Sequence, residues 1–378
     1  METREYKQCT HCVMDTSDSK ITFDENGVCD WCNDYKNHIY PQWQQQLQDK
    51  DLIKRTAEKI KTAGKNRKYD CIIGLSGGVD SSYLCYVAKE IMGLRPLAYV
   101  VDTGWNLNVA NDNIKKITAA LDIDVVTDSI NWEEMRDLQL AFFKSQVPYQ
   151  DFPQDHAIFA SLYNYAVKHK IKYVLTGANN ATECIRPPME WVYINDIKLM
   201  KNIHKKFGKV KLKTFPMCSM FRYRVIYPLF HGMKRVAPLN MIEYDYDKVK
   251  AFLHERFGWQ AYENKHYENV FTRFYEGYYL IKKFGYDKRK CYFSNLILTG
   301  GGTREAALKE LQTPGYDVET IAQDKQFIAE KLGISVEEFD NLINGENKTY
   351  KDYKNSYNFI KFCASILRKL GKENKQFR

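Results

Sequence analysis

Residues 70–84 read DCIIGLSGGVDSSYL, and this stretch decides the fold. Its apolar part, residues 71–75, predicts a buried strand. The two glycines that follow predict a tight turn that opens a helix, because glycine has no Cβ to hinder the turn or the approach of a ligand. N–H groups at a helix start, with serine hydroxyls beside them, are typical of a site for phosphate oxygens. The residues expected to bind there are Ser76, Gly77, Gly78, Val79, Asp80, Ser81 and Ser82.

The pattern S-G-G-x-D-S resembles the pyrophosphate loop of the ATP pyrophosphatases, which cleave ATP between the α- and β-phosphates. No lysine follows the glycines, so the loop is not of the kind that binds a terminal phosphate through a lysine. The alternative is a glycine turn without a ligand, but the strand–turn–helix context favours the phosphate loop. The resemblance implies ATP with Mg²⁺, and we expect catalytic roles for Ser76 and Asp80.

The composition is that of a globular protein with two or three domains. The chain has 378 residues, of which 44% are hydrophobic and 27% charged. Its formal net charge of +9 suits phosphate-bearing small molecules as well as RNA and does not decide between them. The first residues lack the apolar run of a signal peptide, and no segment has the length of a membrane span. We therefore expect a cytoplasmic protein with no membrane contact.

Residues 1–50 are expected to form a unit of their own around two cysteine pairs. Cys9-x-x-Cys12 and Cys29-x-x-Cys32 are separated by 16 residues, a spacing typical of structural Zn²⁺ sites. Four thiolates leave no open position on the ion, so its role is predicted to be structural. Two redox pairs are the alternative. The other cysteines are expected to be buried apolar side chains: Cys71, Cys85, Cys184, Cys218, Cys291 and Cys363.

Residues 51–242 are predicted to form an α/β domain, a parallel sheet with helices on both faces (adenine nucleotide alpha-hydrolase-like). Apolar runs alternate with helical patterns, as in such sheets. The predicted strands are 71–75, 97–101, 124–127, 173–175 and a last edge strand at 236–239. The predicted helices between them include 108–121, 132–145 and 154–169.

Ligands of parallel sheets lie beyond the carboxyl ends of the strands, where the strand order reverses. The second strand ends at Val101 and Asp102, which we expect near the nucleotide. After the fourth strand, Thr176, Gly177 and Glu183 lie in a segment that resembles the T-G…E segment of amidating members of this superfamily. Glu183 is a candidate ligand for Mg²⁺. The alternative for Glu183 is charge compensation at a helix N-terminus.

Residues 243–378 are predicted to be helical, with a core-facing stripe of three-to-four spacing. The stripe consists of Val270, Phe274, Tyr278, Ile281 and Phe284. Basic and polar residues gather around this stripe. They either bind a ligand or form a solvated basic end of the helix. Further upstream, Asp155 and His156 lie where a helix begins and are candidate binding residues. The alternative for Asp155 is an acid of the first helical turn, and the alternative for His156 is a capping or core histidine.

Four segments together resemble the N-acetyl sugar amidotransferase family of bacterial surface-polysaccharide and nonulosonate pathways. They are CTHCVMDTSD with FDENGVCDWC, SGGVDS, PQDHAIFASLYNYA, and the block from residue 265 to 308. The resemblance implies conversion of an acetamido group on a sugar to an acetamidino group, with ATP and ammonia from a glutaminase subunit. It implies that Lys265, His266, Arg273, Lys288 and Arg289 hold an anionic or nucleotide-linked sugar. Lys265 and Arg273 are also expected to be catalytic, and Asp155, His156 and Thr272 are further candidates for substrate binding. The chain departs from the family's pattern at Gly301 and Gly302, which puts a substrate contact there in doubt.

Glutaminase residues are not recognisable in the chain. Glu2 follows Met1, which excludes an N-terminal cysteine nucleophile after simple removal of methionine, and no cysteine lies in a G-x-C-x-G turn. Ammonia is therefore expected from a separate subunit. A tRNA-modifying ligase of the thiolation type and a non-enzymatic nucleotide sensor are the alternatives. No nucleic-acid partner is expected, because both C-x-x-C pairs are assigned to zinc.

Overall fold

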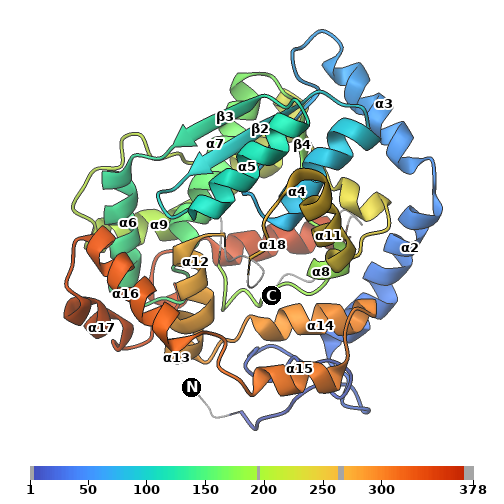
Figure 1. Cartoon of the computed structure of the whole chain (residues 1–378). Helices are drawn as coiled ribbons and strands as arrows, with labels where there is room; N and C mark the ends of the chain where they lie inside the picture. The colour runs from blue at the N-terminus through green and yellow to red at the C-terminus, as the bar shows by residue number, and fades with distance from the viewer. Residues whose placement is uncertain (1–3, 194–195, 263–267, 370–378) are drawn as a thin grey trace.

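The structure, a computed structural model, describes residues 4–193, 196–262 and 268–369. At its centre is a five-stranded parallel sheet with the strand order β3-β2-β1-β4-β5 (Figure 1). The strands are β1 (Cys71–Gly74), β2 (Pro96–Asp102), β3 (Val125–Ser129), β4 (Tyr173–Leu175) and β5 (Lys234–Val236). The chain runs outward from β1 through β2 to β3 and returns to the other side of β1 with β4. The strand order therefore reverses between β1 and β4, where ligands of such sheets lie.

Helices cover both faces of the sheet, as predicted. Alternate side chains of β1 point to opposite faces, because successive residues of a strand do so. Ile73 packs in one apolar cluster with α3 (Leu52–Gly64), α4 (Val79–Tyr86), α5 (Asn108–Ala120) and α11 (Tyr246–Phe257). Ile72 packs in another cluster with α7 (Phe152–Lys168) and α10 (Tyr227–His231). The remaining helices of this region are η2 (Val87–Ile91), α6 (Trp132–Ser145), α8 (Asn180–Glu183), α9 (Ile197–Phe207), η3 (Arg222–Ile226) and η4 (Pro238–Met241).

The predicted edge strand exists but lies two residues earlier than expected. β5 ends at Val236, and Pro238 begins the short helix η4 instead of continuing the strand. Proline has no backbone N–H and a fixed φ that suits the first turn of a helix, which explains the boundary. Consequently Arg235, which the prediction left outside the strand, is its central residue.

The N-terminal residues form a small unit that packs on helices from the other end of the chain. α1 (Asp30–Asp34), η1 (Tyr35–Ile39) and α2 (Tyr40–Gln48) follow its cysteine loops. Arg304 at the start of α15 (Arg304–Leu311) donates to the carbonyl oxygens of Cys9 and Cys12, at 3.0 and 3.1 Å. Ser294 in α14 (Arg289–Thr299) accepts from the Val13 N–H at 3.2 Å. Figure 1 shows this unit beneath α14 and α15.

The C-terminal region is helical, and a π-helical turn changes the phase of its main helix. α12 (Val270–Phe274), η5 (Tyr275–Tyr279) and α13 (Leu280–Phe284) are continuous. Val270 and Phe274 are buried as predicted, but after the π turn Tyr279 and Leu280 are buried instead of Tyr278 and Ile281. A π turn inserts a residue into the helical repeat, and such turns are frequent at functional sites. The helices α16 (Val318–Leu332), α17 (Val336–Ile343), η6 (Tyr350–Asp352) and α18 (Tyr357–Lys369) follow.

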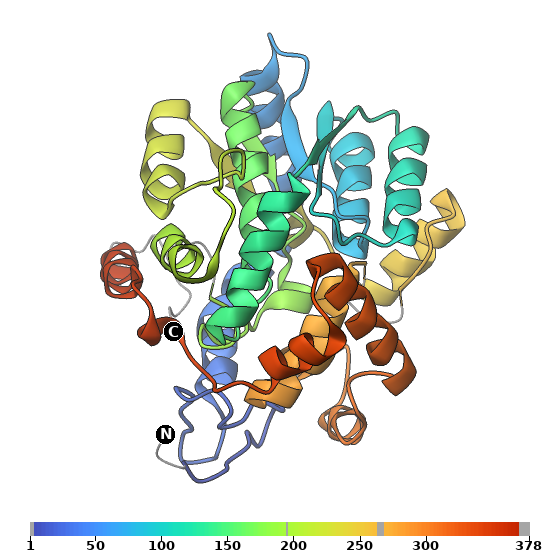
Figure 2. The ribbon, with the colours of Figure 1, turned by 90° about the vertical axis from the view of Figure 1, so that its left-hand side faces the viewer.

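A membrane-crossing helix is not found in the described part of the chain, because none of its helices combines the necessary length and apolar character. Figure 2 shows α18 (red) on the side of the molecule away from α16 and α17.

Candidate active site

The turn after β1 has a conformation that requires glycine. Gly77 has φ +84°, and a Cβ on it would lie 2.6 Å from the carbonyl oxygen of Ala110. The Gly77 carbonyl oxygen accepts hydrogen bonds from Trp259 Nε1 at 2.9 Å and from the Tyr262 hydroxyl at 3.1 Å. The C-terminal half of the chain therefore helps to fix the shape of the loop.

The loop opens into the first turn of α4, above a cavity of about 170 Å³. Gly78 is the N-cap of α4 and has no side chain that could cap the helix, and uncapped N–H groups of a first helical turn can bind phosphate oxygens. The Ser76 hydroxyl accepts from the Gly78 N–H at 3.3 Å and lies 3.2 Å from the Ser81 hydroxyl. The predicted residues that line this cavity are Ser76, Gly78, Val79, Asp80, Ser81, Gly177 and Glu183.

Asp80 is held in place by two donors. Its Oδ1 accepts hydrogen bonds from the Tyr244 hydroxyl and from Asn179 Nδ2, the latter at 3.2 Å. Burial, and then the Asp80 carboxylate, raise the pKa of Tyr244, so this phenol keeps its proton. A Cβ on Gly177 would lie 3.2 Å from the Cβ of Asp80, so the turn after β4 approaches the carboxylate closely. These contacts fix the direction of Asp80 toward the cavity.

The short helix α8 carries Glu183 and is anchored from α14. Asn179 caps α8 by accepting from the Thr182 N–H at 2.9 Å. Thr299 donates to the Ala181 carbonyl oxygen at 3.1 Å, and Asn295 accepts from the Ile185 N–H at 2.5 Å. Glu183 therefore lies on a turn that is fixed at both ends.

Glu183 also lines a second, larger cavity of about 900 Å³. This cavity lies between α8, β5, the helix α12–η5–α13, α14 and the start of α16. Its basic lining residues are Arg186, Arg235, Arg273, Lys288 and Arg289, and its acidic ones are Glu183, Glu276, Glu310 and Asp317. Tyr292, Phe293 and Tyr316 add aromatic surface. A mixed lining of this size suits a polar ligand with a carbohydrate part.

Each of the predicted basic residues in the large cavity is paired with an acid. Arg273 donates through Nε and Nη2 to both oxygens of Asp324, at 2.8 and 2.7 Å. Lys288 pairs with Glu276. Burial alone would lower the pKa of Lys288, but the nearby Glu276 carboxylate outweighs burial, so the pKa is raised overall.

Arg289 bonds to Asp287 at 2.7 Å and donates to the Thr313 carbonyl oxygen at 3.1 Å. Like the other two cations, it is thus held in a defined direction at the cavity wall.

Several predicted site residues lie elsewhere. Ser82 is fully buried, so its hydroxyl does not reach the loop cavity. His156 is 1% exposed and packs between the rings of Phe152 and Phe215, and burial lowers its pKa to about 4. This agrees with its alternative role as a core histidine.

The remaining predictions have mixed placements. Asp155 is exposed, and Thr272 contacts Gln154 and Asp151 behind the cavity wall. Asp102 accepts from the Gly104 N–H at 2.8 Å at the end of β2. Neither cavity is lined by Gly77, Val101, Asp102, Thr176, Asp155, Thr272, Gly301 or Gly302. Lys265 and His266 lie outside the described residues.

Several residues that line the two cavities but were not predicted from the sequence come from β5 onward. Arg235 and Asn240 line the large cavity, while Lys250 and Glu268 line the loop cavity. The basic and polar residues of β5 and η4 could have indicated Arg235 and Asn240. They were missed because the strand was predicted at 236–239 instead of 234–236. Tyr244 and the other partners of the loop lie far from it in the sequence, and no local pattern marks them.

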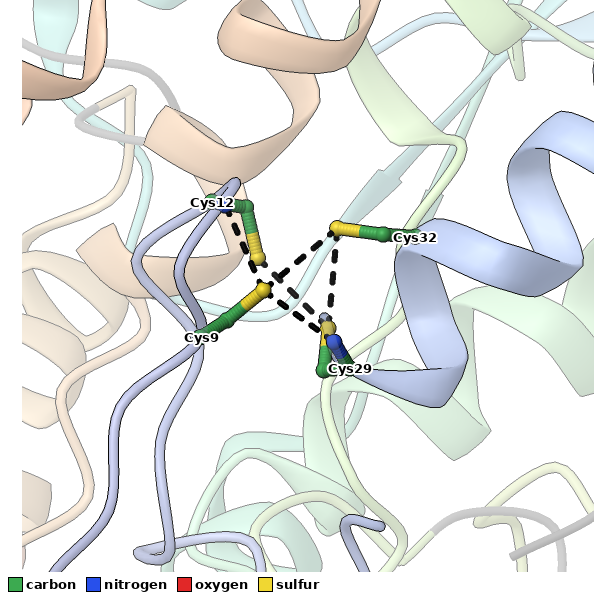
Figure 3. A group of neighbouring side chains, drawn as sticks. All are labelled: Cys9, Cys12, Cys29 and Cys32. Carbon is green, nitrogen blue, oxygen red and sulfur yellow. Dashed lines mark hydrogen bonds between the residues drawn. The ribbon is translucent and has the colours of Figure 1, made fainter. Parts of the chain in front are cut away.

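The four N-terminal cysteines converge on one point, as Figure 3 shows. The Sγ atoms of Cys9 and Cys32 are 3.8 Å apart. The Sγ atom of Cys29 lies 3.6 Å from the Sγ atoms of Cys12 and Cys32. A tetrahedral Zn²⁺ with bonds of about 2.3 Å requires sulfur–sulfur distances of about 3.8 Å. The N–H groups of Cys12 and Cys29 donate to Cys9 Sγ, at 3.4 and 3.2 Å, which stabilises thiolate charge. The cluster therefore fits a single metal ion.

The arrangement can position a nucleotide beside a second substrate. N–H groups and hydroxyls surround the loop cavity, as phosphate oxygens require. Asp80 and Glu183 offer carboxylate oxygens in the same cavity, the donors that Mg²⁺ prefers. Because Glu183 lines both cavities, a phosphate at the loop and a polar ligand in the large cavity would meet there.

Comparison with protein families matches residues 268–367 to the LPS biosynthesis protein WbpG-like, C-terminal domain. The match covers α12 to α17 and most of α18, and over these residues it confirms the resemblance drawn from the sequence. A comparison with curated proteins finds no match.

Among solved structures, this chain is similar to the NH3-dependent NAD synthetase from Campylobacter jejuni, with 14% identity over 78% of this chain and 97% of that chain and a TM-score of 0.31. The U34-tRNA thiolase NcsA from Methanococcus maripaludis has 17% identity with this chain. The similarity covers 72% of this chain and 88% of the thiolase, with a TM-score of 0.31. The NMN synthetase from Francisella tularensis has 15% identity with this chain. The similarity covers 57% of this chain and 99% of the synthetase, with a TM-score of 0.28.

Proposed function

We propose that the chain is the synthetase component of an ATP-dependent amidotransferase that converts an acetamido group of a sugar to an acetamidino group. The observation that carries the proposal is the position of Glu183, which lines both the phosphate-loop cavity and the large cavity. ATP at the loop and a sugar in the large cavity would bring the α-phosphate beside the acetamido group. The match of residues 268–367 to a domain named for LPS biosynthesis supports a surface-glycan sugar as the substrate.

In the proposed reaction, the acetamido oxygen attacks the α-phosphorus of ATP, and pyrophosphate leaves. Ammonia then adds to the amide carbon, and AMP leaves with the original oxygen, so that nitrogen has replaced oxygen. The first-turn N–H groups of α4 and the Ser76 hydroxyl bind the departing pyrophosphate. Asp80 and Glu183 would hold Mg²⁺, which neutralises phosphate charge. The chain mainly positions the reactants and stabilises charge.

The cations of the large cavity are proposed to bind the sugar and any phosphate or carboxylate it carries. Arg273, Lys288 and Arg289 each have an acidic partner that fixes their direction. A fixed cation loses little conformational freedom when it binds an anion, which favours specific recognition. Lys265 and His266 keep their proposed roles from the family resemblance.

Ammonia is proposed to come from a separate glutaminase subunit. The cysteines whose side chains the structure describes are all buried. Cys291 lines the large cavity, but burial raises its pKa, which makes its thiol a poor nucleophile. We place the reaction in the cytoplasm.

The test is release of pyrophosphate by the purified chain with ammonium as the nitrogen source. A panel of acetamido sugars, free and nucleotide-linked, is compared with tRNA and with no second substrate. Release that depends on one class of sugar supports the proposal. Release only with tRNA would support a tRNA-modifying ligase, and no release with any substrate would support a nucleotide sensor. Use of glutamine as efficiently as ammonium by the chain alone would refute the separate subunit.

A further inference from the structure

The first feature that the proposed function does not use is a lysine-rich surface on α9. Residues 197–213 read IKLMKNIHKKFGKVKLK and contain seven lysines and no acidic residue. All seven lysines are exposed, whereas Leu199, Met200 and Ile203 are buried against the protein. The helix therefore presents a face of positive charge that none of its own carboxylates compensates.

The second feature is an exposed apolar stripe on α18. Phe359, Phe362 and Ile366 are 62%, 61% and 41% exposed. Their spacing of three and four residues places them on one face of the helix. Phenylalanine side chains exposed in a row are unusual on a protein surface and mark interaction sites.

The segment that leads into α18 is joined to α9. The Lys354 N–H donates to Asn202 of α9 at 2.9 Å, and the Ser356 N–H donates to Asp196 at the start of α9 at 2.5 Å. Lys206 lies over the ring of Tyr353, 4.6 Å from its centre. In Figure 2, α18 (red) and α9 (yellow-green) both lie at the left of the molecule. We call the seven lysines of residues 198–213 with Phe359, Phe362 and Ile366 the α9–α18 face.

Charge and apolar surface continue around this face. Residues 354–369 contain four lysines and arginines and no acidic residue. On the same side of Figure 2 lies α10. Leu229 and Phe230 there are each 74% exposed.

We propose that the α9–α18 face binds an anionic lipid surface. A helix with aromatic and aliphatic residues on one face and lysines beside it lies in the interface of a bilayer, with its apolar side chains at the boundary of headgroups and acyl chains. Clusters of four to eight basic residues at such a helix bind anionic headgroups. The lysines of α9 supply this charge, and Phe359, Phe362 and Ile366 supply the apolar contact.

The same chemistry disfavours two other occupants. A second copy of the chain would bring two lysine-rich faces together, and like charges repel. Single-stranded RNA binds through bases stacked on rings along a groove. The stripe on α18 instead follows one side of a helix and includes an aliphatic residue.

The experiment measures co-sedimentation of the full chain with vesicles. Vesicles of phosphatidylcholine are compared with vesicles of phosphatidylcholine and phosphatidylglycerol in equal parts. We expect binding to the anionic vesicles only, weakened by salt. The variants F359S/F362S and K205E/K206E are expected to bind about tenfold more weakly. Matched controls are V318S, an exposed apolar side chain on α16, and K54E/K59E on α3, which should bind like the unchanged chain.

Four outcomes would overturn the proposal. They are no binding to anionic vesicles, equal binding to neutral ones, equal weakening by the control variants, and binding of a fluorescent RNA oligonucleotide in preference to vesicles. A dimer of the unchanged chain that F359S/F362S dissociates would also refute it. Thermal unfolding shows whether F359S/F362S folds; if it does not, K205E/K206E decides alone. Pyrophosphate release by the folded variants should be unchanged, which separates this proposal from the proposed function.

Discussion

The Ser76 hydroxyl donates a hydrogen bond to the carboxylate of Glu268, with 3.4 Å between Oγ and Oε1, although 192 positions separate them in the sequence. The same Oε1 would lie 3.0 Å from a Cβ on Gly78. A negative charge from the C-terminal region thus lies over the phosphate loop. Phosphate oxygens that enter the loop cavity must approach this carboxylate, and the two charges repel each other.

Removal of that charge is therefore expected to strengthen nucleotide binding when Mg²⁺ is absent. Two charges about 4 Å apart near a protein surface interact by about 1 to 4 kcal/mol. For Glu268→Gln we predict a dissociation constant for ATP at least about threefold lower in EDTA, measured by calorimetry. Glu255→Gln, an exposed glutamate on α11, is the control. Unchanged or weaker ATP binding in Glu268→Gln would contradict this role of the carboxylate.

Asp80 is expected to be essential for turnover but not for folding. Asp80→Asn keeps the size of the side chain but removes the charge that would bind Mg²⁺. We predict that pyrophosphate release falls by at least about a hundredfold, with the unfolding temperature nearly unchanged. Asp112→Asn, an exposed residue of α5, is the control.

Tyr244→Phe tests the positioning of Asp80 and should have a smaller effect, of about tenfold on kcat, because Asn179 still donates to the Asp80 carboxylate. Full activity of Asp80→Asn would remove Asp80 from the site.

Local sequence patterns predicted the loop and the helices around it well, because the interactions that form them are local. The apolar run before Ser76 and the glycines after it suffice for strand, turn and helix. The partners of the loop could not be predicted in this way. Trp259, Tyr244 and Glu268 contact it across more than a hundred residues, and only the fold determines which side chains meet.

His156 is expected to make stability depend on pH. Burial lowers its pKa to about 4, whereas an unfolded histidine has a pKa of about 6.5. Between these values the unfolded state binds a proton that the folded state does not, so the free energy of unfolding rises with pH. The contribution is fully present above about pH 6.5 and is lost as the pH falls to about 4, by up to about 3 kcal/mol.

The measurement is urea unfolding at several pH values between these limits. His156→Gln should flatten the dependence, because glutamine does not titrate. His38→Gln, whose imidazole is 55% exposed beside Asp34, should leave it unchanged. An equal pH dependence in His156→Gln would show that other groups cause it.

The cysteine cluster is expected to bind one Zn²⁺ per chain, which elemental analysis can count. The ligands of an iron–sulfur cluster bind different irons and lie further apart than ligands of a single ion, so iron in place of zinc would contradict the assignment. Removal of the ion by a chelator should lower the unfolding temperature by at least about 10 °C. Arg304 and Ser294 bind this unit to α15 and α14, so KM for the proposed sugar substrate should rise more than KM for ATP. Loss of all activity in a fully folded apo form would show that the metal is not purely structural.

The large cavity was predictable only in part. Arg273, Lys288 and Arg289 were identified from the family resemblance and do line it. Their acidic partners were not, since Asp324 is 51 positions from Arg273 and no pattern links the two. Arg235 was missed because the strand was placed too late. The lysines of α9 went unrecognised because their alternation with apolar residues is what any surface helix shows.

Asn295 and Thr299 of α14 set the position of α8, and therefore of Glu183. The α14 wall of the large cavity and the Glu183 carboxylate at the border of the two cavities are thus fixed to each other and move together. Exchange of the C-terminal helices with those of a relative would move Glu183 unless both anchoring side chains came with them. A chimaera that changes substrate choice therefore needs its junctions outside α8 and α14, with the two helices transferred as a pair.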